Sequence, residues 1–269
     1  MIFDLFNHKQ KQLNIRAVCL SHIGNVRENN EDNYLYNGRF LPMIHNDEIV
    51  PMVENYDLDT AKIFAVMDGM GGESAGELAS FVAASELSKY FNDNLLTTET
   101  FHDGSFLFDK LIEISDVVYF AGKEKNYSTI GTTLSMIIFF KDYGIVCNIG
   151  DSPIYRFRDG SLKEIYHAHT NEEWLKQQGI NRKPGLIQFL GISSQDMIIQ
   201  PYIEQISLME NDIYLICSDG LTDMVSENVI VSILNSEDDL YNKGVVLINT
   251  ALDNGGKDNI TIVLCRIFM

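Results

Sequence analysis

The feature that most constrains the fold of this chain is a set of strand-like segments that are apolar on both faces. Eight segments are rich in β-branched and aromatic residues: 13–20, 62–67, 132–140, 144–149, 153–158, 198–206, 212–217 and 259–267. Runs such as IFAVM (63–67) hardly alternate between polar and apolar residues, which is typical of strands covered on both sides. The sequence therefore predicts sheets buried between other layers.

Three amphipathic helices are predicted, over 74–91, 106–125 and 238–253. The first follows directly on a buried strand and begins with a capping box of Ser74 and Glu77. Long helices beside buried strands predict sheets that are covered by helices.

Composition limits the class of protein. The 269 residues contain no repeat, low-complexity tract or proline-rich linker, which predicts a single domain over 1–269. A net charge of −18 disfavours binding to a nucleic-acid backbone or an anionic membrane surface.

Cysteine usage and the first residues bear on the compartment. The four cysteines lie in apolar runs without a CxxC pair, so we expect reduced thiols in the core. The start, MIFDLFNHKQKQ, is too short and polar for a signal peptide, and no apolar run approaches the roughly 18 residues of a membrane helix. These features predict a soluble, cytoplasmic protein.

Four aspartates lie at the ends of apolar strands: Asp68, Asp151, Asp219 and Asp258. A carboxylate at the rim of a buried sheet loses hydration, which is unfavourable unless a counter-charge compensates. Glycines in the adjoining turns allow close approach to a ligand, and the carbonyl of Gly69 can itself be one. Oxygen ligands suit Mg²⁺ or Mn²⁺, and no histidine adjoins these turns along the chain.

Each of these segments has a plainer interpretation when taken alone. An Asp-Gly pair is a common turn signal, and GDSP (150–153) is typical of a hairpin turn. The segment GNVRENNED (24–32), which contains Arg27, Glu31 and Asp32, is compatible with a solvated charged loop. Beside a metal cluster, however, an arginine suits bidentate binding of a phosphate.

Six short motifs, in order along the chain, resemble those of the protein phosphatase 2C (PPM) family of metal-dependent serine/threonine phosphatases. They are VRENNED (26–32), AVMDGMGG (65–72), GTTL (131–134), NIGDSPIYR (148–156), ICSDGLTD (216–223) and KDNITIVL (257–264). DGMGG is similar to the bacterial branch of the family. The resemblance implies an α+β fold, an αββα sandwich of two antiparallel β-sheets flanked by helical pairs.

The resemblance also implies roles for individual residues. Two Mn²⁺ or Mg²⁺ ions would be held by Asp68, the Gly69 carbonyl, Asp219 and Asp258, and a third, weaker cation by Asp151 and Asp223. Glu31 and Asp32 would hold metal-bound waters, and Arg27 would bind the substrate phosphate. A water that bridges the two cations would attack phosphorus directly.

Three departures from the family pattern stand out. Met70 replaces the histidine proposed as general acid in animal relatives, and Glu73 stands where bacterial relatives usually have histidine. The flap-like segment 167–190 looks short and lacks the usual Asp-His pair; its Trp174 is expected to pack it down. The insert 38–61 is expected to be a surface loop.

The function predicted in this way is hydrolysis of phosphoserine and phosphothreonine in proteins, opposing a serine/threonine kinase, by a monomer without an organic cofactor. Two alternatives stay open. One is a catalytically weak relative that acts as a phosphoprotein-binding regulatory module. The other is a structural calcium site in a binding protein, which would not need Arg27 or Glu31.

Overall fold

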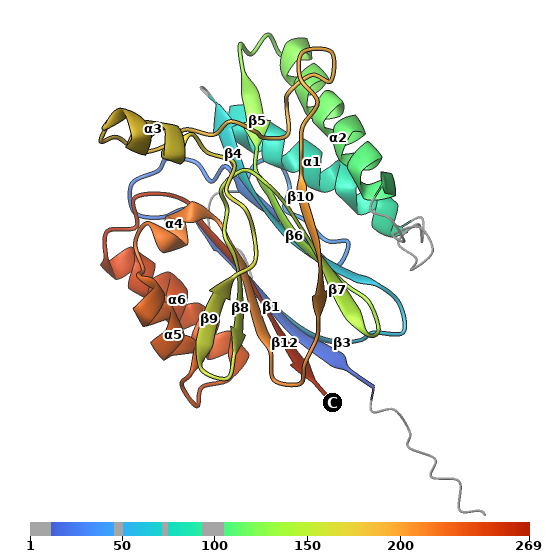
Figure 1. Cartoon of the computed structure of the whole chain (residues 1–269), viewed down its shortest axis with the longest axis vertical. Coiled ribbons are helices and arrows are strands. Elements are labelled where there is room, and N and C mark those ends of the chain that lie inside the picture. The colour runs from blue at the N-terminus through green and yellow to red at the C-terminus, as the bar shows by residue number, and fades with distance from the viewer. Residues whose placement is uncertain (1–11, 46–50, 72–74, 93–104) are drawn as a thin grey trace, which may run out of the picture.

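Two antiparallel β-sheets pack face to face in the computed structural model, which describes residues 12–45, 51–71, 75–92 and 105–269 (Figure 1). The first sheet has the order β3-β1-β12-β11-β8-β9, formed by Met52–Asp57, Asn14–His22, Ile260–Phe268, Ile213–Cys217, Ile154–Arg158 and Ser161–Glu164. The second has the order β10-β7-β6-β4-β2, formed by Tyr202–Ser207, Tyr143–Ile149, Leu134–Phe139, Lys62–Gly71 and Asp32–Tyr36. The short strand β5 (Ile130–Thr132) pairs with the end of β4.

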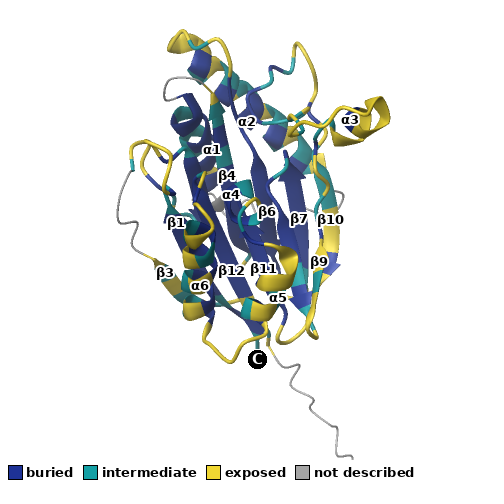
Figure 2. Cartoon of the chain, turned by 90° about the vertical axis from the view of Figure 1, so that its left-hand side faces the viewer, coloured by how far each residue is buried: buried dark blue, intermediate teal, exposed yellow. Residues whose placement is uncertain are grey.

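Pairs of helices cover the outer faces of the sandwich. α1 (Ala75–Asn92) and α2 (Ser105–Glu124) cover the second sheet, whereas α5 (Glu227–Leu234) and α6 (Leu240–Asp253) cover the first (Figure 1). The inner strands are buried, the edge strands β3, β9 and β10 are partly exposed, and the helices expose their outer sides (Figure 2). The predicted αββα sandwich is confirmed.

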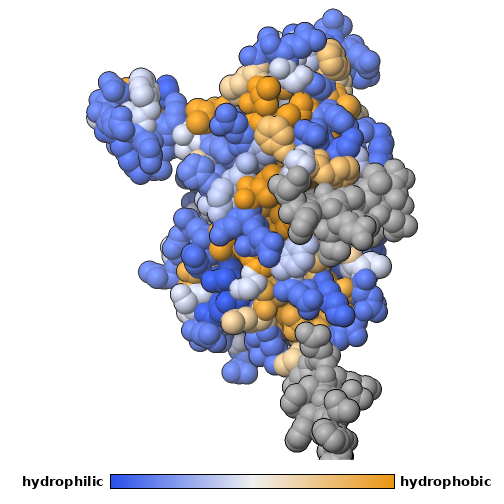
Figure 3. Space-filling model, turned by 45° about the vertical axis from the view of Figure 1, so that its right-hand side comes forward, coloured by the Kyte–Doolittle hydropathy of each residue, from blue (hydrophilic) through white to orange (hydrophobic). Residues whose placement is uncertain are grey.

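Two short helices lie near one end of the sandwich. α3 (Glu172–Gln178) projects from the body, and α4 (Asp219–Thr222) lies nearby (Figure 1). The surface of the projecting segment is mostly hydrophilic (Figure 3). Trp174 is 52% exposed, so the expectation that it packs the flap down is wrong. The buried residue of α3 is instead its neighbour Leu175.

The side chains of β4 alternate between the two faces of its sheet, so this one strand packs into two apolar layers. Phe64 and Val66 belong to the layer between the sheets, while Ile63, Ala65 and Met67 pack toward α1 and α2. Successive side chains of a strand point to opposite faces. Asp68 therefore continues the Phe64 and Val66 side, at the end of the layer between the sheets.

The structure differs from the sequence prediction in a few elements. The segment 132–140 forms two strands, because Thr133 interrupts the run and exchanges hydrogen bonds with the backbone of Asp68 instead. The insert 38–61 is not wholly a loop, since Met52–Asp57 forms β3 on the edge next to β1. Strand β2 was not predicted, and Ser74 of the predicted capping box lies outside the described residues.

The state of the cysteines agrees with a further expectation. Cys19, Cys147, Cys217 and Cys265 are all buried and unpaired. Within the ranges that the structure describes, none of the helices combines the length and apolarity needed to cross a membrane.

Candidate functional site

Acidic residues from distant parts of the chain meet at one end of the sandwich, around a cavity of about 280 Å³. Its lining includes Glu31, Asp68, Asp151, Asp219 and Asp258, together with Gly69, Met70, Arg27 and Lys183. Asp223 lines a neighbouring cavity of about 380 Å³ that also reaches Asp258 and Lys183. Asp32 is buried and lines neither cavity.

The sheets themselves bring these side chains together. Asp32 of β2 lies directly opposite Asp68 of β4 in the antiparallel register. Asp219 is the first residue of α4, which follows the end of β11, and Asp258 immediately precedes the segment that leads into β12. Because β11 and β12 are neighbours and antiparallel, the end of one lies beside the start of the other.

Burial and mutual repulsion both perturb the Asp68 carboxylate. Burial raises its pKa well above the ordinary value, and the charges of Asp32, Asp219, Asp258 and Asp151 raise it further. No ion pair to Asp68 is found among the residues described. An ionised Asp68 is therefore unfavourable in this site unless a cation is added.

Asp32 and Glu31 show the same effect. Burial raises the pKa of Asp32 to about 7, although the hydroxyl of Ser218 donates to its Oδ2 at 2.7 Å. Burial, followed by repulsion from Glu77, raises the pKa of Glu31 to about 7. The Oε2 atom of Glu77 is buried and has no hydrogen-bond partner among the described residues.

The backbone around Asp68 is held in several directions. Its N–H donates to the Oγ1 of Thr133, and its carbonyl accepts from the N–H of Thr133 at 2.9 Å and the hydroxyl of Thr132 at 3.0 Å. The N–H of Gly69 donates to the carbonyl of Glu31. A Cβ at Gly69 would lie 2.3 Å from the Gly76 carbonyl oxygen, so only glycine allows this close approach.

Asn259 holds the arginine-bearing loop against the start of β12. Its Oδ1 accepts from the N–H of Glu31 at 2.8 Å, and its Nδ2 donates to the carbonyls of Ile23 and Asn29 at 2.8 and 2.9 Å. Its positioning role was not predicted, although the residue is part of the motif KDNITIVL.

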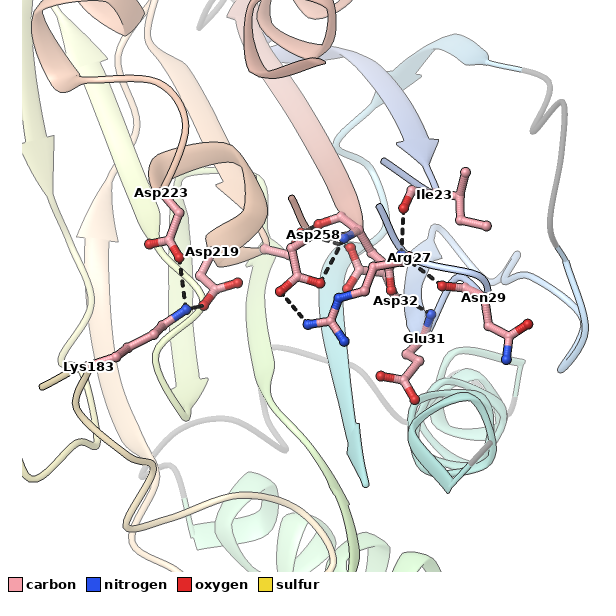
Figure 4. Close-up of polar contacts among 11 residues, drawn as sticks. Ile23, Arg27, Asn29, Glu31, Asp32, Lys183, Asp219, Asp223 and Asp258 are labelled. Atoms are coloured by element: carbon pink, nitrogen blue, oxygen red, sulfur yellow. Dashed lines mark hydrogen bonds and ion pairs between the residues drawn. The ribbon is translucent and has the colours of Figure 1, made fainter. Parts of the chain in front are cut away.

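Arg27 lies at the cavity but is paired with an aspartate. Its Nη2 donates to Oδ2 of Asp258 at 2.7 Å, and its side chain is 48% exposed (Figure 4). The hydrogen bond to Asp258 raises the pKa of Arg27, so the guanidinium stays charged.

Lys183 of the flap-like segment is a site residue that the sequence did not indicate. Its Nζ donates to Oδ2 of Asp219 at 3.0 Å and to Oδ2 of Asp223 at 2.8 Å (Figure 4). These partners are 36 and 40 residues away along the chain, and Lys183 itself lies in an irregular segment, where no periodic pattern exists to reveal the contacts.

Asp151 follows a tight turn that a histidine stabilises. Gly150 has φ +103°, and its N–H donates to Nδ1 of His169 at 3.2 Å, while the N–H of His169 donates to the Gly150 carbonyl at 2.9 Å. Burial, followed by the charge of Asp219, raises the pKa of Asp151 to about 6. Thus a histidine does adjoin one of the predicted turns in space, though not along the chain.

The oxygen atoms that line the cavity suit divalent cations, although they do not yet surround a single ion position. Among the described residues, no three or more acidic, histidine or cysteine side chains are arranged as a ready ligand set. The cavity nonetheless is lined by several carboxylates, and carboxylate and carbonyl oxygens are the donors preferred by Mg²⁺ and Mn²⁺; Thr133 and Met70 also line it. Its two cationic side chains, Arg27 and Lys183, already pair with Asp258 and Asp219. A bound cation would therefore compensate the charge of Asp68.

Glu73, which departs from the pattern of bacterial relatives, lies outside the described residues.

Comparison with known proteins places these observations in a family. A family model described as protein phosphatase 2C matches residues 53–237. The serine/threonine phosphatase stp of Listeria welshimeri is 33% identical over 235 residues, which cover 82% of this chain and 89% of that protein. The protein phosphatase PhpP of Streptococcus pneumoniae serotype 2 is 30% identical over 211 residues, covering 73% and 82%.

Solved structures of similar proteins point to the same family as the sequence comparisons. The crystal structure of the catalytic domain of the serine threonine protein phosphatase PstP, in complex with two manganese ions, is similar with a TM-score of 0.74 at 28% identity. The match covers 96% of this chain and all of that one. Motif order, sheet topology, the acidic cavity and these similarities lead to one conclusion: this chain belongs to the protein phosphatase 2C family.

Proposed function

We propose that this chain hydrolyses phosphoserine and phosphothreonine in proteins at the acidic cavity, as a metal-dependent serine/threonine phosphatase. The observation that carries the proposal is the gathering of Asp68, Asp219 and Asp258 around one cavity that an arginine also lines. The phosphatase names of the relatives and the two manganese ions of the PstP structure support it.

In this proposal the aspartates hold two divalent cations. Asp68 and the Gly69 carbonyl would bind one, Asp68 would reach the second, and Asp219 and Asp258 would complete its site. When bound, such cations supply an activated water and neutralise charge on the phosphate oxygens. Glu31 and the buried Asp32 would hold metal-bound waters, and a third, weaker cation would bind at Asp151 and Asp223.

Arg27 is proposed to hold the substrate phosphate. It projects into the cavity from a loop that Asn259 anchors, and its half-exposed guanidinium can exchange the Asp258 carboxylate for a phosphate dianion. Met70 lines the cavity where some relatives have a histidine, so this side chain offers no proton donor to the leaving oxygen.

The remaining parts of the proposal concern context. We propose that residues 1–269 act as one phosphatase domain that includes the flap-like segment 167–190, which hydrogen bonds between His169 and Gly150 tie to the sandwich. Phosphorylated proteins are the proposed substrates, with a serine/threonine kinase as the opposing enzyme. The proposed state is a cytoplasmic monomer.

Metal removal tests the proposal. Chelator is expected to reduce hydrolysis of a chromogenic aryl phosphate to background, Mn²⁺ to restore it, and Ca²⁺ not to restore it, because Ca²⁺ prefers more ligands at longer distances than Mg²⁺. Initial rates across a metal titration measure this. A regulatory module would bind a phosphopeptide without hydrolysing it, and a structural calcium site would favour Ca²⁺; either result would reject the enzymatic proposal.

Arg27→Ala tests phosphate binding. KM for a phosphopeptide is expected to rise about tenfold, the effect of losing one charge-assisted contact, while kcat changes less. Steady-state kinetics at saturating Mn²⁺ separate the two parameters. Lys176→Ala is the matched control, because it removes an exposed cation from α3 without touching the cavity. An unchanged KM in Arg27→Ala would remove the proposed role.

A further inference from the structure

Lys183 lies where two parts of the acidic site meet. It lines both the 280 Å³ cavity with Asp68 and the 380 Å³ cavity with Asp223. Its ammonium group bridges Asp219 and Asp223 at hydrogen-bond distance from both (Figure 4). The ammonium group of Lys183 therefore contacts both Asp219, a proposed ligand of the second cation, and Asp223, a proposed ligand of the third.

The backbone that carries Lys183 is fixed relative to the aspartates. Asn171 closes the loop, because its N–H donates to the Gly185 carbonyl at 3.1 Å and its Oδ1 accepts from the Gly185 N–H at 2.9 Å. Ile187 then donates to the carbonyl of His169, whose N–H is bonded to Gly150 beside Asp151. Pro184 restricts the conformation of Lys183 further. The lysine is thus presented to the site by a closed loop.

The ammonium group of Lys183 is close to three aspartates. Its ion pairs to Asp219 and Asp223 are 3.0 and 2.8 Å long. Asp151 lines the same cavity as Lys183 and Asp219. Lys183 therefore compensates the same three aspartates that lie around the proposed third-cation position.

We propose that Lys183 is a tethered cation that competes with a divalent ion for Asp223 and Asp219, and so weakens the binding of the third cation in this chain. The proposal rests on the proposed function for the nature of the competing ion. The Oδ2 atom of Asp223 accepts from the ammonium group at 2.8 Å, so the lysine and a third ion compete for this oxygen. Because the flap is attached to the sandwich, the lysine competes at high effective concentration.

Titration calorimetry of the metal-free chain with MnCl₂ tests this. In Lys183→Gln, the weakest Mn²⁺ site is expected to bind roughly five- to tenfold more tightly than in the wild type, the range of a favourable ion-pair network. Lys176→Gln, which removes an equally exposed cation paired with Glu172 on the same segment, is expected to change that affinity less than about twofold. The double variant Lys183→Gln/Asp223→Asn should lose the gain, and circular dichroism confirms folding of each variant.

Two results would overturn the proposal: a Lys183→Gln titration that superimposes on the wild type, or an equal gain in Lys176→Gln, which would indicate a general charge effect. The tight Mn²⁺ sites and hydrolysis of the wild type report separately on the proposed function. An active wild type with an unaffected Lys183→Gln titration rejects the lysine alone. A wild type that neither binds Mn²⁺ nor hydrolyses phosphate rejects the function and the competition together, because the competition requires a bound Mn²⁺.

Discussion

Asp68→Asn is expected to lower kcat by at least about a thousandfold while the protein stays folded. This magnitude follows from losing several kcal/mol of metal-derived stabilisation of the transition state, at about tenfold per 1.4 kcal/mol. An amide can replace the shape of the carboxylate but not its charge. Single-turnover rates at saturating Mn²⁺ on an aryl phosphate measure the loss without interference from product release.

The same substitution is expected to stabilise the metal-free protein, which is the opposite of what loss of a structural carboxylate does. Burial and neighbouring charges raise the pKa of Asp68 in the folded state. A carboxylate with a raised folded pKa binds its proton more tightly when folded, so its contribution to stability is greatest at low pH and is lost as the pH rises above its unfolded value of about 3.8. Asparagine carries no charge and avoids that loss.

Thermal unfolding in chelator at pH 5 and pH 7.5 therefore separates a metal-binding carboxylate from a structural one. Asp68→Asn is expected to exceed the wild type by more at pH 7.5 than at pH 5. Asp142→Asn is the control, because this exposed residue lies in the turn between β6 and β7 at the far end of the sheet. Near-normal turnover, or a variant less stable than the wild type in chelator, would contradict the proposed role of Asp68.

Asp212→Ala is expected to lower the free energy of unfolding by about 3–5 kcal/mol, the typical cost of removing one partner from a buried charge pair. The Asp212 carboxylate is fully buried at the start of β11. Its oxygens accept from Nε and Nη2 of Arg158 at 2.6 and 2.7 Å, from the Met209 N–H at 2.8 Å and from the Tyr214 hydroxyl at 3.0 Å. The substitution removes the acceptor that all of these donors share.

Chemical denaturation measures this loss, and Asp142→Ala provides a matched control with an exposed aspartate. Asp212 lies at the opposite end of β11 from Asp219, so kcat at a temperature where the variant is folded should stay within about twofold of the wild type. A loss of stability below about 1 kcal/mol would mean that the site relaxes or admits water.

The buried strands could be predicted because short apolar runs rich in β-branched residues and bounded by turn residues are typical of them. Strands β2 and β3 could not be predicted in this way. Strand β2 has the sequence DNYLY, and aspartate and asparagine are depleted in strands. Asn33 is tolerated there because its side chain bonds to the backbone of Leu41, a contact made only in the folded chain. Strand β3 is a half-exposed edge strand whose polar residues resemble a loop.

Prediction of the site was limited in a similar way. The aspartates were detectable because each follows or precedes a buried strand, and the sheet order then brings them together. Lys183 and His169 were not, since their contacts depend on how an irregular segment folds back onto the turns at Asp151 and Asp219. The metal-ligand roles themselves stay predictions.

The four buried cysteines give this protein an intrinsic reporter of the separation of its layers, since Cys19 and Cys265 lie between the sheets and Cys147 and Cys217 lie under the helices. Each lies in a strand of the sandwich, in β1, β7, β11 and β12, and burial raises the pKa of every one of these thiols. Alkylating reagents attack the thiolate, so labelling has to wait until the layers part. The rate of thiol modification thus follows the separation of these layers, without any introduced probe, in the presence or absence of metal.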